Sequence, residues 1–337
     1  MEKLPPGKLR NELLREVIFP NLGVEDGKVI YGPKEGFDSA VLEYDEKHYL
    51  IVATDPTLGV PAETFGFFAY HFASSDVAVF GAKPRWLVVD FVLPPGTVRE
   101  FLERTMNDLN GECRRFGSAI IGGHTGVYPS VREPVATTTA MGLVKREELK
   151  LPLAKPGDRI IVTDKVALEF AVSAAYFRAD ELKGFLTPGE LSKLRSLYRL
   201  ETVLPDALIA KPLVRGMHDA TEGGLTALHE IADNSGLGFV VYPERLRLDP
   251  LVEKVLDFYG LEPWSVSSTG TLIAITPPEK SNQSIAELHK NGITAFELGK
   301  FTADKKRVLV ENGEEKVFPT FKGDPYVELY SKGLISP

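Results

Sequence analysis

Apolar residues along the chain recur in two patterns, helical spacing and short unbroken runs, which predict a mixture of helices and strands. In the first half, a helix is predicted from Leu9 to Ile18, and Pro20 ends it. Two further helices are expected at residues 63–80 and 98–116, and the second is strongly amphipathic. Strands are expected at residues 39–43, 49–54, 85–93, 119–121 and 135–144.

A break in this pattern at residues 151–158 contains Pro152 and Pro156-Gly157-Asp158 and predicts a domain boundary. Beyond it, helices are expected at residues 167–178, 188–204, 222–235, 250–259 and 278–291, and strands at 159–163, 238–241, 271–276, 294–298 and 307–311. The length of 337 residues also favours two domains. We predict a mixed α/β (α+β) fold with domains at residues 1–152 and 153–337, each with its own sheet.

Composition narrows the class of protein. Hydrophobic residues make up 43% of the chain and charged residues 26%, as in ordinary globular proteins. The net charge of −8 argues against nucleic acid as a partner and leaves acids available for divalent cations. Cys113 is the single cysteine, which excludes an intrachain disulfide and a zinc site with two or more cysteines. Without a signal-like start or an apolar run of about 18 residues, we expect a cytoplasmic protein that does not contact membranes.

Four acids stand in places where acids are uncommon. Asp55 closes an apolar strand, and Asp76 lies among apolar residues of a predicted helix. Asp38 precedes a strand of small residues, and Asp219 precedes a glycine pair at a helix entry. A helix cap or a turn is an alternative for Asp38 and for Asp219 taken alone. Because buried carboxylates need partners, the four together predict a site for Mg²⁺ or Mn²⁺.

Two glycine pairs are candidate phosphate contacts. Gly122-Gly123-His124-Thr125 follows a predicted strand, and Gly223-Gly224 follows Asp219. Glycine turns let backbone N–H groups approach phosphate oxygens, although a plain turn is the alternative for either pair. His124 is a candidate base, a phosphate contact or a turn residue. The sequence contains neither a P-loop lysine motif nor a G-x-G-x-x-G fingerprint.

Taken in order, these motifs resemble those of the aminoimidazole ribonucleotide (AIR) synthase superfamily, which includes HypE, selenophosphate synthetase and thiamine-monophosphate kinase. The most specific match is Ser75-Asp76-Val77-Ala78-Val79-Phe80-Gly81-Ala82-Lys83-Pro84. The other matching stretches are residues 36–41, 54–55, 122–125, 218–224 and 267–272. The resemblance covers nearly the whole chain and is nearest to HypE-like proteins.

The resemblance implies a homodimer whose N-terminal domains pair into an intersubunit β-barrel, with a C-terminal α/β sandwich. It implies ATP in a cleft at that interface, with Mg²⁺ held by Asp38, Asp55, Asp76 and Asp219. His124 is the candidate catalytic residue. The residues implied to contact the cofactor are Gly36, Gly122, Gly123, Thr125, Thr221, Gly223 and Gly224.

The chain also departs from these relatives. Ser39 stands where a second acid is usual. HypE carries its carbamoyl group on a C-terminal cysteine, whereas this sequence ends Leu334-Ile335-Ser336-Pro337. Near the N-terminus, Lys3 and Lys8 lack the cysteine of selenophosphate synthetases. We therefore predict ATP-dependent activation of a small molecule without dehydration of a tail thiocarbamate. A non-catalytic nucleotide-binding protein and a Mg²⁺-dependent nucleotide or phosphoester phosphohydrolase are the alternatives.

Overall fold

The chain forms two compact units with one sheet each. The computed structural model describes residues 4, 7–9, 11–327 and 329, so Lys3 and residues 334–337 lie outside the described part. The small unit comprises residues 26–33 and 38–149, and the large unit comprises residues 1–25, 34–37 and 150–337. Two sheets with helices confirm the predicted mixed α/β fold. The domain limits at 152 and 153 stay a prediction, because compactness does not show where an independently folding domain ends.

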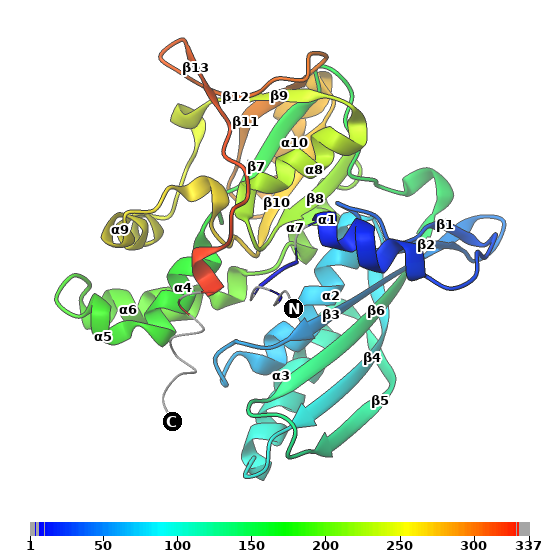
Figure 1. Cartoon of the computed structure of the whole chain (residues 1–337), viewed down its shortest axis with the longest axis vertical. Helices are drawn as coiled ribbons and strands as arrows, with labels where there is room; N and C mark the ends of the chain where they lie inside the picture. The colour runs from blue at the N-terminus through cyan, green and yellow to red at the C-terminus, as the bar shows by residue number, and fades with distance from the viewer. Residues whose placement is uncertain (1–3, 5–6, 10, 328, 330–337) are drawn as a thin grey trace. The chain divides into compact units, whose positions relative to one another are not determined.

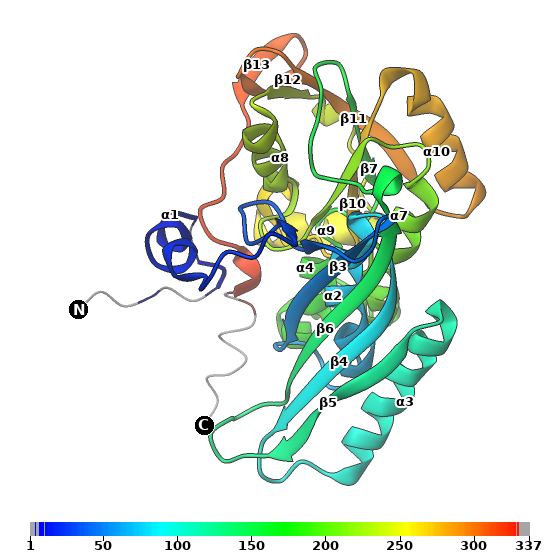
Figure 2. The ribbon, with the colours of Figure 1, turned by 90° about the vertical axis from the view of Figure 1, so that its right-hand side faces the viewer.

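The small unit is built on a six-stranded sheet in the order β1-β2-β3-β6-β4-β5. Figures 1 and 2 show β3, β6, β4 and β5 side by side. All neighbouring pairs are antiparallel except β4 and β5, which are parallel. The strands are β1 (Val29–Tyr31), β2 (Ala40–Glu43), β3 (His48–Thr57), β4 (Lys83–Leu93), β5 (Ala119–Val127) and β6 (Val135–Lys145).

Helices α2 (Phe65–Val79) and α3 (Arg99–Phe116) belong to the same unit. Alternate residues of β6 from Ala136 to Val144 are buried, as expected for a strand with one covered face. On that face the Thr138 hydroxyl donates to the Ala69 carbonyl of α2 at 2.6 Å. Helix α2 therefore packs on the side of the sheet to which Thr138 points.

A buried polar pair joins α2 to α3. His71 is fully buried, and its Nε2 lies 3.1 Å from Oε2 of Glu112. The hydrogen bond from His71 holds the pKa of Glu112 below its usual value. A carboxyl group with a lowered folded-state pKa stabilises the fold above its unfolded pKa and ceases to do so as the pH falls through the folded value.

We therefore expect Glu112→Gln to lower the free energy of unfolding by about 1–3 kcal/mol at pH 7. The difference from wild type should shrink as the pH falls below about 4.5, the ordinary pKa of the group. Urea unfolding at pH 7, 5 and 4 measures it. Glu103→Gln is the control, because Glu103 forms an exposed pair with Arg99 on the same helix. A constant difference at all three pH values would contradict the expectation.

The large unit has a seven-stranded sheet in the order β13-β12-β9-β11-β7-β10-β8. Its pairs are antiparallel except β12 with β9. The strands are β7 (Arg159–Thr163), β8 (Gly216–Ala220), β9 (Gly238–Val241), β10 (Thr271–Thr276), β11 (Ala295–Thr302), β12 (Arg307–Glu311) and β13 (Glu314–Val317). The helices are α1 (Asn11–Leu13), α4 (Leu168–Phe177), α5 (Ala179–Leu182), α6 (Pro188–Ser196), α7 (Leu204–Ala210), α8 (Ala227–Ser235), α9 (Pro250–Tyr259) and α10 (Ser281–Lys290).

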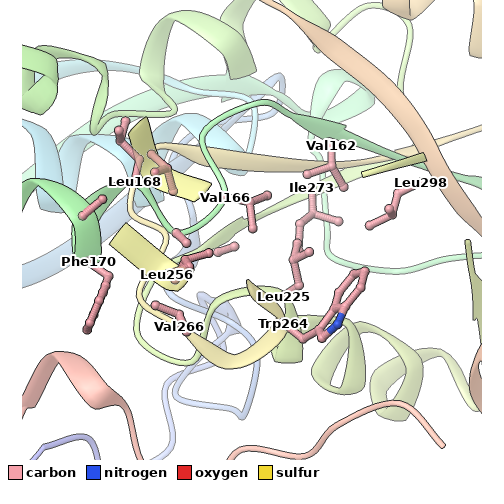
Figure 3. Close-up of a cluster of buried hydrophobic side chains, with 14 of the residues drawn as sticks. Val162, Val166, Leu168, Phe170, Leu225, Leu256, Trp264, Val266, Ile273 and Leu298 are labelled. Atoms are coloured by element: carbon pink, nitrogen blue, oxygen red, sulfur yellow. The ribbon is translucent and has the colours of Figure 1, made fainter. Parts of the chain in front are cut away.

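The core of the large unit lies between this sheet and its helices. Figure 3 shows Val162 of β7, Ile273 of β10 and Leu298 of β11 gathered near Trp264. Such buried apolar surface contributes about 25 cal/mol per Å² removed from water. No helix in the described part of the chain is long and apolar enough to cross a lipid bilayer.

The start of the chain is tied into the large unit by polar contacts. Arg15 forms a two-pronged ion pair with Glu35, whose carbonyl accepts a hydrogen bond from the Asn234 side chain at 2.9 Å. The backbone N–H of Lys8 donates to Glu222 at 2.9 Å. Hydrogen bonds between residues far apart in the sequence therefore hold the first segment against the rest of this unit.

Candidate functional site

The first glycine motif lies inside a strand. Residues Gly122 to Thr125 are exposed positions of β5, so the prediction that they form a turn is wrong. Leu87 and Val88 of β4 pair with Ile120 and Gly122, so the register skips Ile121 and marks a β-bulge on β5 beside the glycines. Gly123 has a φ of 143°, and a Cβ there would lie 1.9 Å from the Val89 carbonyl oxygen. Close approach of β4 thus requires a glycine at this position.

The sheet register relates the candidates of the small unit to one another. Asp55 of β3 pairs with Thr138, Thr138 with Val89, and Val89 with Gly123. Asp55 and Gly123 therefore stand in one row with two strands between them, about 14 Å apart at the usual strand spacing. Next to this row, His124 pairs with Asp90, and its Nε2 lies 2.6 Å from the Tyr128 hydroxyl.

Asp55 of β3 and Asp76 of α2 lie at different heights along the axis of helix α2. Asp55 pairs with Thr138, which contacts Ala69. Asp76 lies seven residues beyond Ala69, a rise of about 10 Å along a helix. Asp76 is 7% exposed, and Asp38 directly precedes Ser39 and strand β2. The small unit thus carries these three acids in strand β3, in helix α2 and in the loop before strand β2.

Asp219 lies within strand β8 and pairs with Leu272 of β10, so it is not a helix cap. Its neighbour His218 is buried and contacts two other groups, which the sequence alone did not predict. The His218 Nδ1 lies 2.7 Å from the Asp219 carbonyl oxygen, and its Nε2 lies 3.4 Å from Oε2 of Glu230. Burial raises the pKa of Glu230, but contact with His218 outweighs this and lowers it.

The second glycine motif is already engaged by a carboxylate. Gly223 has a φ of 85°, and its N–H donates to Asp324 at 2.7 Å. Asp324 also accepts from the Ser267 hydroxyl at 2.8 Å and from the Tyr326 N–H at 2.9 Å. The Gly224 N–H donates to the Thr221 carbonyl at 2.9 Å. The N–H groups of Gly223 and Gly224 therefore already have acceptors within the chain, and a contact of this turn with phosphate stays a prediction.

Gly36 has a structural reason to be glycine. It has a φ of 68°, and a Cβ there would lie 2.9 Å from both the Asn234 amide nitrogen and Glu230 Cβ of helix α8. The position thus combines left-handed backbone with close packing.

Carboxylates are the donors that Mg²⁺ prefers, so the chemistry of Asp38, Asp55, Asp76 and Asp219 fits that ion. Among the described residues, neither unit by itself brings three acidic, histidine or cysteine ligand atoms within 4.8 Å of one another. Three of the four acids belong to the small unit and Asp219 to the large unit. The shared cation site therefore stays a prediction.

Comparison with known proteins gives sequence relatives over most of the chain. The model of the AIR synthase related protein N-terminal domain matches residues 36–144, and that of the C-terminal domain matches residues 155–311. A putative hydrogenase expression/formation protein of Methanocaldococcus jannaschii is 27% identical, over 90% of this chain and 91% of that protein. The carbamoyl dehydratase HypE of Azotobacter vinelandii is 30% identical, over 77% of each chain.

Solved structures share the fold. AaThiL complexed with AMPPCP and TMP superposes with a TM-score of 0.72 and 20% identity, over 94% of this chain and 98% of that one. The hydrogenase maturation protein HypE in complex with ATP gives 0.66 and 20% identity, over 96% and 98%. The two matched family models, the HypE relative and the two-sheet architecture agree, and the chain belongs to the AIR synthase-related family as a two-domain member.

Proposed function

We propose that this protein is a Mg²⁺- and ATP-dependent enzyme that phosphorylates, and thereby activates, a small-molecule substrate. The observation that carries the proposal is the 30% identity to a carbamoyl dehydratase HypE over 77% of the chain. Solved proteins of the same fold are described in complex with ATP and with AMPPCP. Phosphoryl transfer depends on positioning and charge neutralisation, which carboxylate-held Mg²⁺ supplies.

In this proposal, Asp38, Asp55 and Asp76 hold Mg²⁺, with Asp219 as a fourth ligand. The backbone at Gly122, Gly123 and Thr125 contacts phosphate oxygens. Gly36, Thr221, Gly223 and Gly224 are proposed to line the nucleotide site as well. His124 is the proposed acid–base residue, with the Tyr128 hydroxyl at 2.6 Å fixing the orientation of its ring.

The chain's own thiol does not suit the role of a group carrier. Cys113 is the single cysteine of the 337 residues and is buried in α3. Burial, and then the charge of Glu112, raise the pKa of Cys113 to about 11, so the reactive thiolate is scarce at neutral pH. We therefore propose a diffusible acceptor.

The decisive experiment is calorimetric titration of the full chain with Mg·ATP. We expect binding to wild type and at least about tenfold weaker binding to Asp76→Asn, because ligand charge sets the affinity of such sites. Asp257→Asn, the same change at an exposed position of α9, is the control and should bind as wild type does. Absence of binding to wild type would refute the proposal, and full binding by Asp76→Asn would remove Asp76 from the site.

Turnover separates the proposal from its two alternatives. With the correct acceptor, a kinase-type enzyme releases ADP from ATP and leaves AMP untouched. Phosphate release from AMP would favour the phosphohydrolase. Nucleotide binding with no product from a broad panel of acceptors would favour the non-catalytic alternative.

We also propose that two copies pair through the outer edge of β5, which has no neighbouring strand among the described residues. Large apolar side chains are exposed on β5 at Ile120, Ile121 and Val127 and directly after it at Tyr128, at 40%, 57%, 56% and 40% exposure. An unpaired strand edge with apolar side chains is a template for another strand. A second copy of the same edge is the proposed partner.

A further inference from the structure

The segment Val266–Thr271 of the large unit lies next to two glutamates, Glu169 and Glu201. The segment includes most of the motif at residues 267–272, which has no assigned role. Thr269 donates to Oε2 of Glu169 from its backbone nitrogen at 3.1 Å and from its hydroxyl at 2.6 Å. Gly270 lies against a third segment: a Cβ there would lie 2.8 Å from the Glu201 Cα and 2.4 Å from the Leu200 carbonyl oxygen. Glu169 and Glu201, from two separate earlier segments of the chain, therefore both adjoin this one turn.

One oxygen of the buried Glu201 carboxyl group has no hydrogen-bond donor among the described residues. Glu201 is 2% exposed, and the oxygen without a donor is Oε1. Burial, and then the charge of Glu169, raise the pKa of Glu201 well above its usual value. The geometry agrees, because the two residues, the Glu169–Glu201 pair, adjoin the same turn, Glu169 at Thr269 and Glu201 at Gly270.

Other buried acids of the same unit have cationic partners. Asp206 contacts the Lys165 Nζ at 2.7 Å, and Asp158 contacts the Arg215 Nε at 2.6 Å. In the described part of the chain, no lysine, arginine or histidine forms an ion pair with Glu169 or Glu201. A buried carboxylate without a partner is costly, and a bound cation would offset that cost.

We propose that the Glu169–Glu201 pair binds a positively charged group, and that this group is an ammonium of the acceptor substrate. An ammonium brings three N–H donors, enough for both carboxylates. A divalent metal suits the site less, since no third acidic or histidine ligand among the described residues joins the pair in a cluster of ligand atoms within 4.8 Å. The substrate identity of the ammonium rests on the proposed phosphoryl transfer, whereas the cation site itself does not.

The test uses the full chain at pH 8, above the value of about 7 to which burial raises the pKa of Glu169. Methylammonium chloride is titrated at constant ionic strength, with tetramethylammonium chloride, which has no N–H group, as the matched salt. We expect a saturable rise in Tm with methylammonium alone. The apparent affinity should fall about tenfold or more in Glu201→Gln and in Glu169→Gln. Glu279→Gln, an exposed control in the same unit, should behave as wild type.

Three results would overturn the proposal. Equal rises in wild type and both pair variants would show non-specific stabilisation. No rise in wild type, together with a higher Tm for Glu201→Gln without added salt, would show two carboxyl groups sharing a proton. A pair-dependent rise with MgCl₂ or CaCl₂ but not with methylammonium would overturn the ammonium assignment. Titration of the same samples with Mg·ATP reports separately on the proposed function, and circular dichroism confirms that each variant folds.

Discussion

Gly123→Ala is expected to destabilise the small unit by more than about 4 kcal/mol, a large part of the 5–15 kcal/mol typical of a domain. The new Cβ would lie 1.9 Å from the Val89 carbonyl oxygen, and the φ of 143° disfavours any L side chain. The clash involves a backbone atom of the paired strand, and the φ angle belongs to the backbone itself. Rotation of a side chain therefore relieves neither. Strand β5 should separate from β4.

Hydrogen exchange measured by mass spectrometry on residues 83–93 and 119–127 detects this separation. Gly122→Ala is the matched control, because a Cβ at Gly122 would have no neighbour within 4 Å. We expect the control to change stability by less than about 1 kcal/mol. Equal behaviour of the two variants would show that the close approach of β4 and β5 does not determine this strand.

Ile121→Lys is expected to convert the proposed dimer into a monomer. Ile121 is 57% exposed on the edge strand β5, and the proposed interface places its side chain against the second copy. A buried lysine without a partner would cost more than about 2 kcal/mol, a weakening of more than about thirtyfold in the dimer Kd. The exposed residue should leave folding of the single chain unchanged.

Sedimentation velocity over a range of protein concentrations measures the effect. Val98→Lys is the control, since Val98 is 60% exposed but caps helix α3 and lies off the proposed edge. If wild type sediments as a monomer at all concentrations, pairing through β5 is wrong. If both variants remain dimeric, the dimer uses another surface.

The apolar patterns predicted most elements because each pattern reflects local burial. The expected helix at residues 250–259 and strand at 271–276 coincide with α9 and β10. Strand β3 continues through Asp55 and Pro56 to Thr57, beyond the predicted end at Thr54. Pairing with β6 along this whole stretch outweighs the low strand propensity of those two residues.

The glycine motif shows where local signals mislead. Gly122-Gly123 reads as a turn, but glycine in a strand interior also marks a bulge or close backbone approach. Which meaning applies depends on Val89, more than thirty residues earlier, whose carbonyl oxygen meets the Gly123 position. No pattern around the glycines contains that information.

Some residues of the candidate sites could likewise be recognised from the sequence, and others could not. The acids at strand ends and within helices could be recognised individually, since each conflicts with its apolar neighbours. Glu169 and Glu201 could not, because each is an ordinary acid in its own segment and only the turn at Thr269-Gly270 brings them together. A glutamate in the first turn of a helix, such as Glu169 in α4, is common and gives no signal.

The large unit is assembled from three separate segments of the chain, and this affects how the chain folds during synthesis. Residues 38–149 of the small unit are continuous, so most of it can form as soon as it leaves the ribosome. Arg15 and Glu35 emerge earlier, but Asn234 and Glu222, which hold this first segment, are made about 200 residues later. At roughly 5–20 residues per second, the first segment waits 10 seconds or more for its partners.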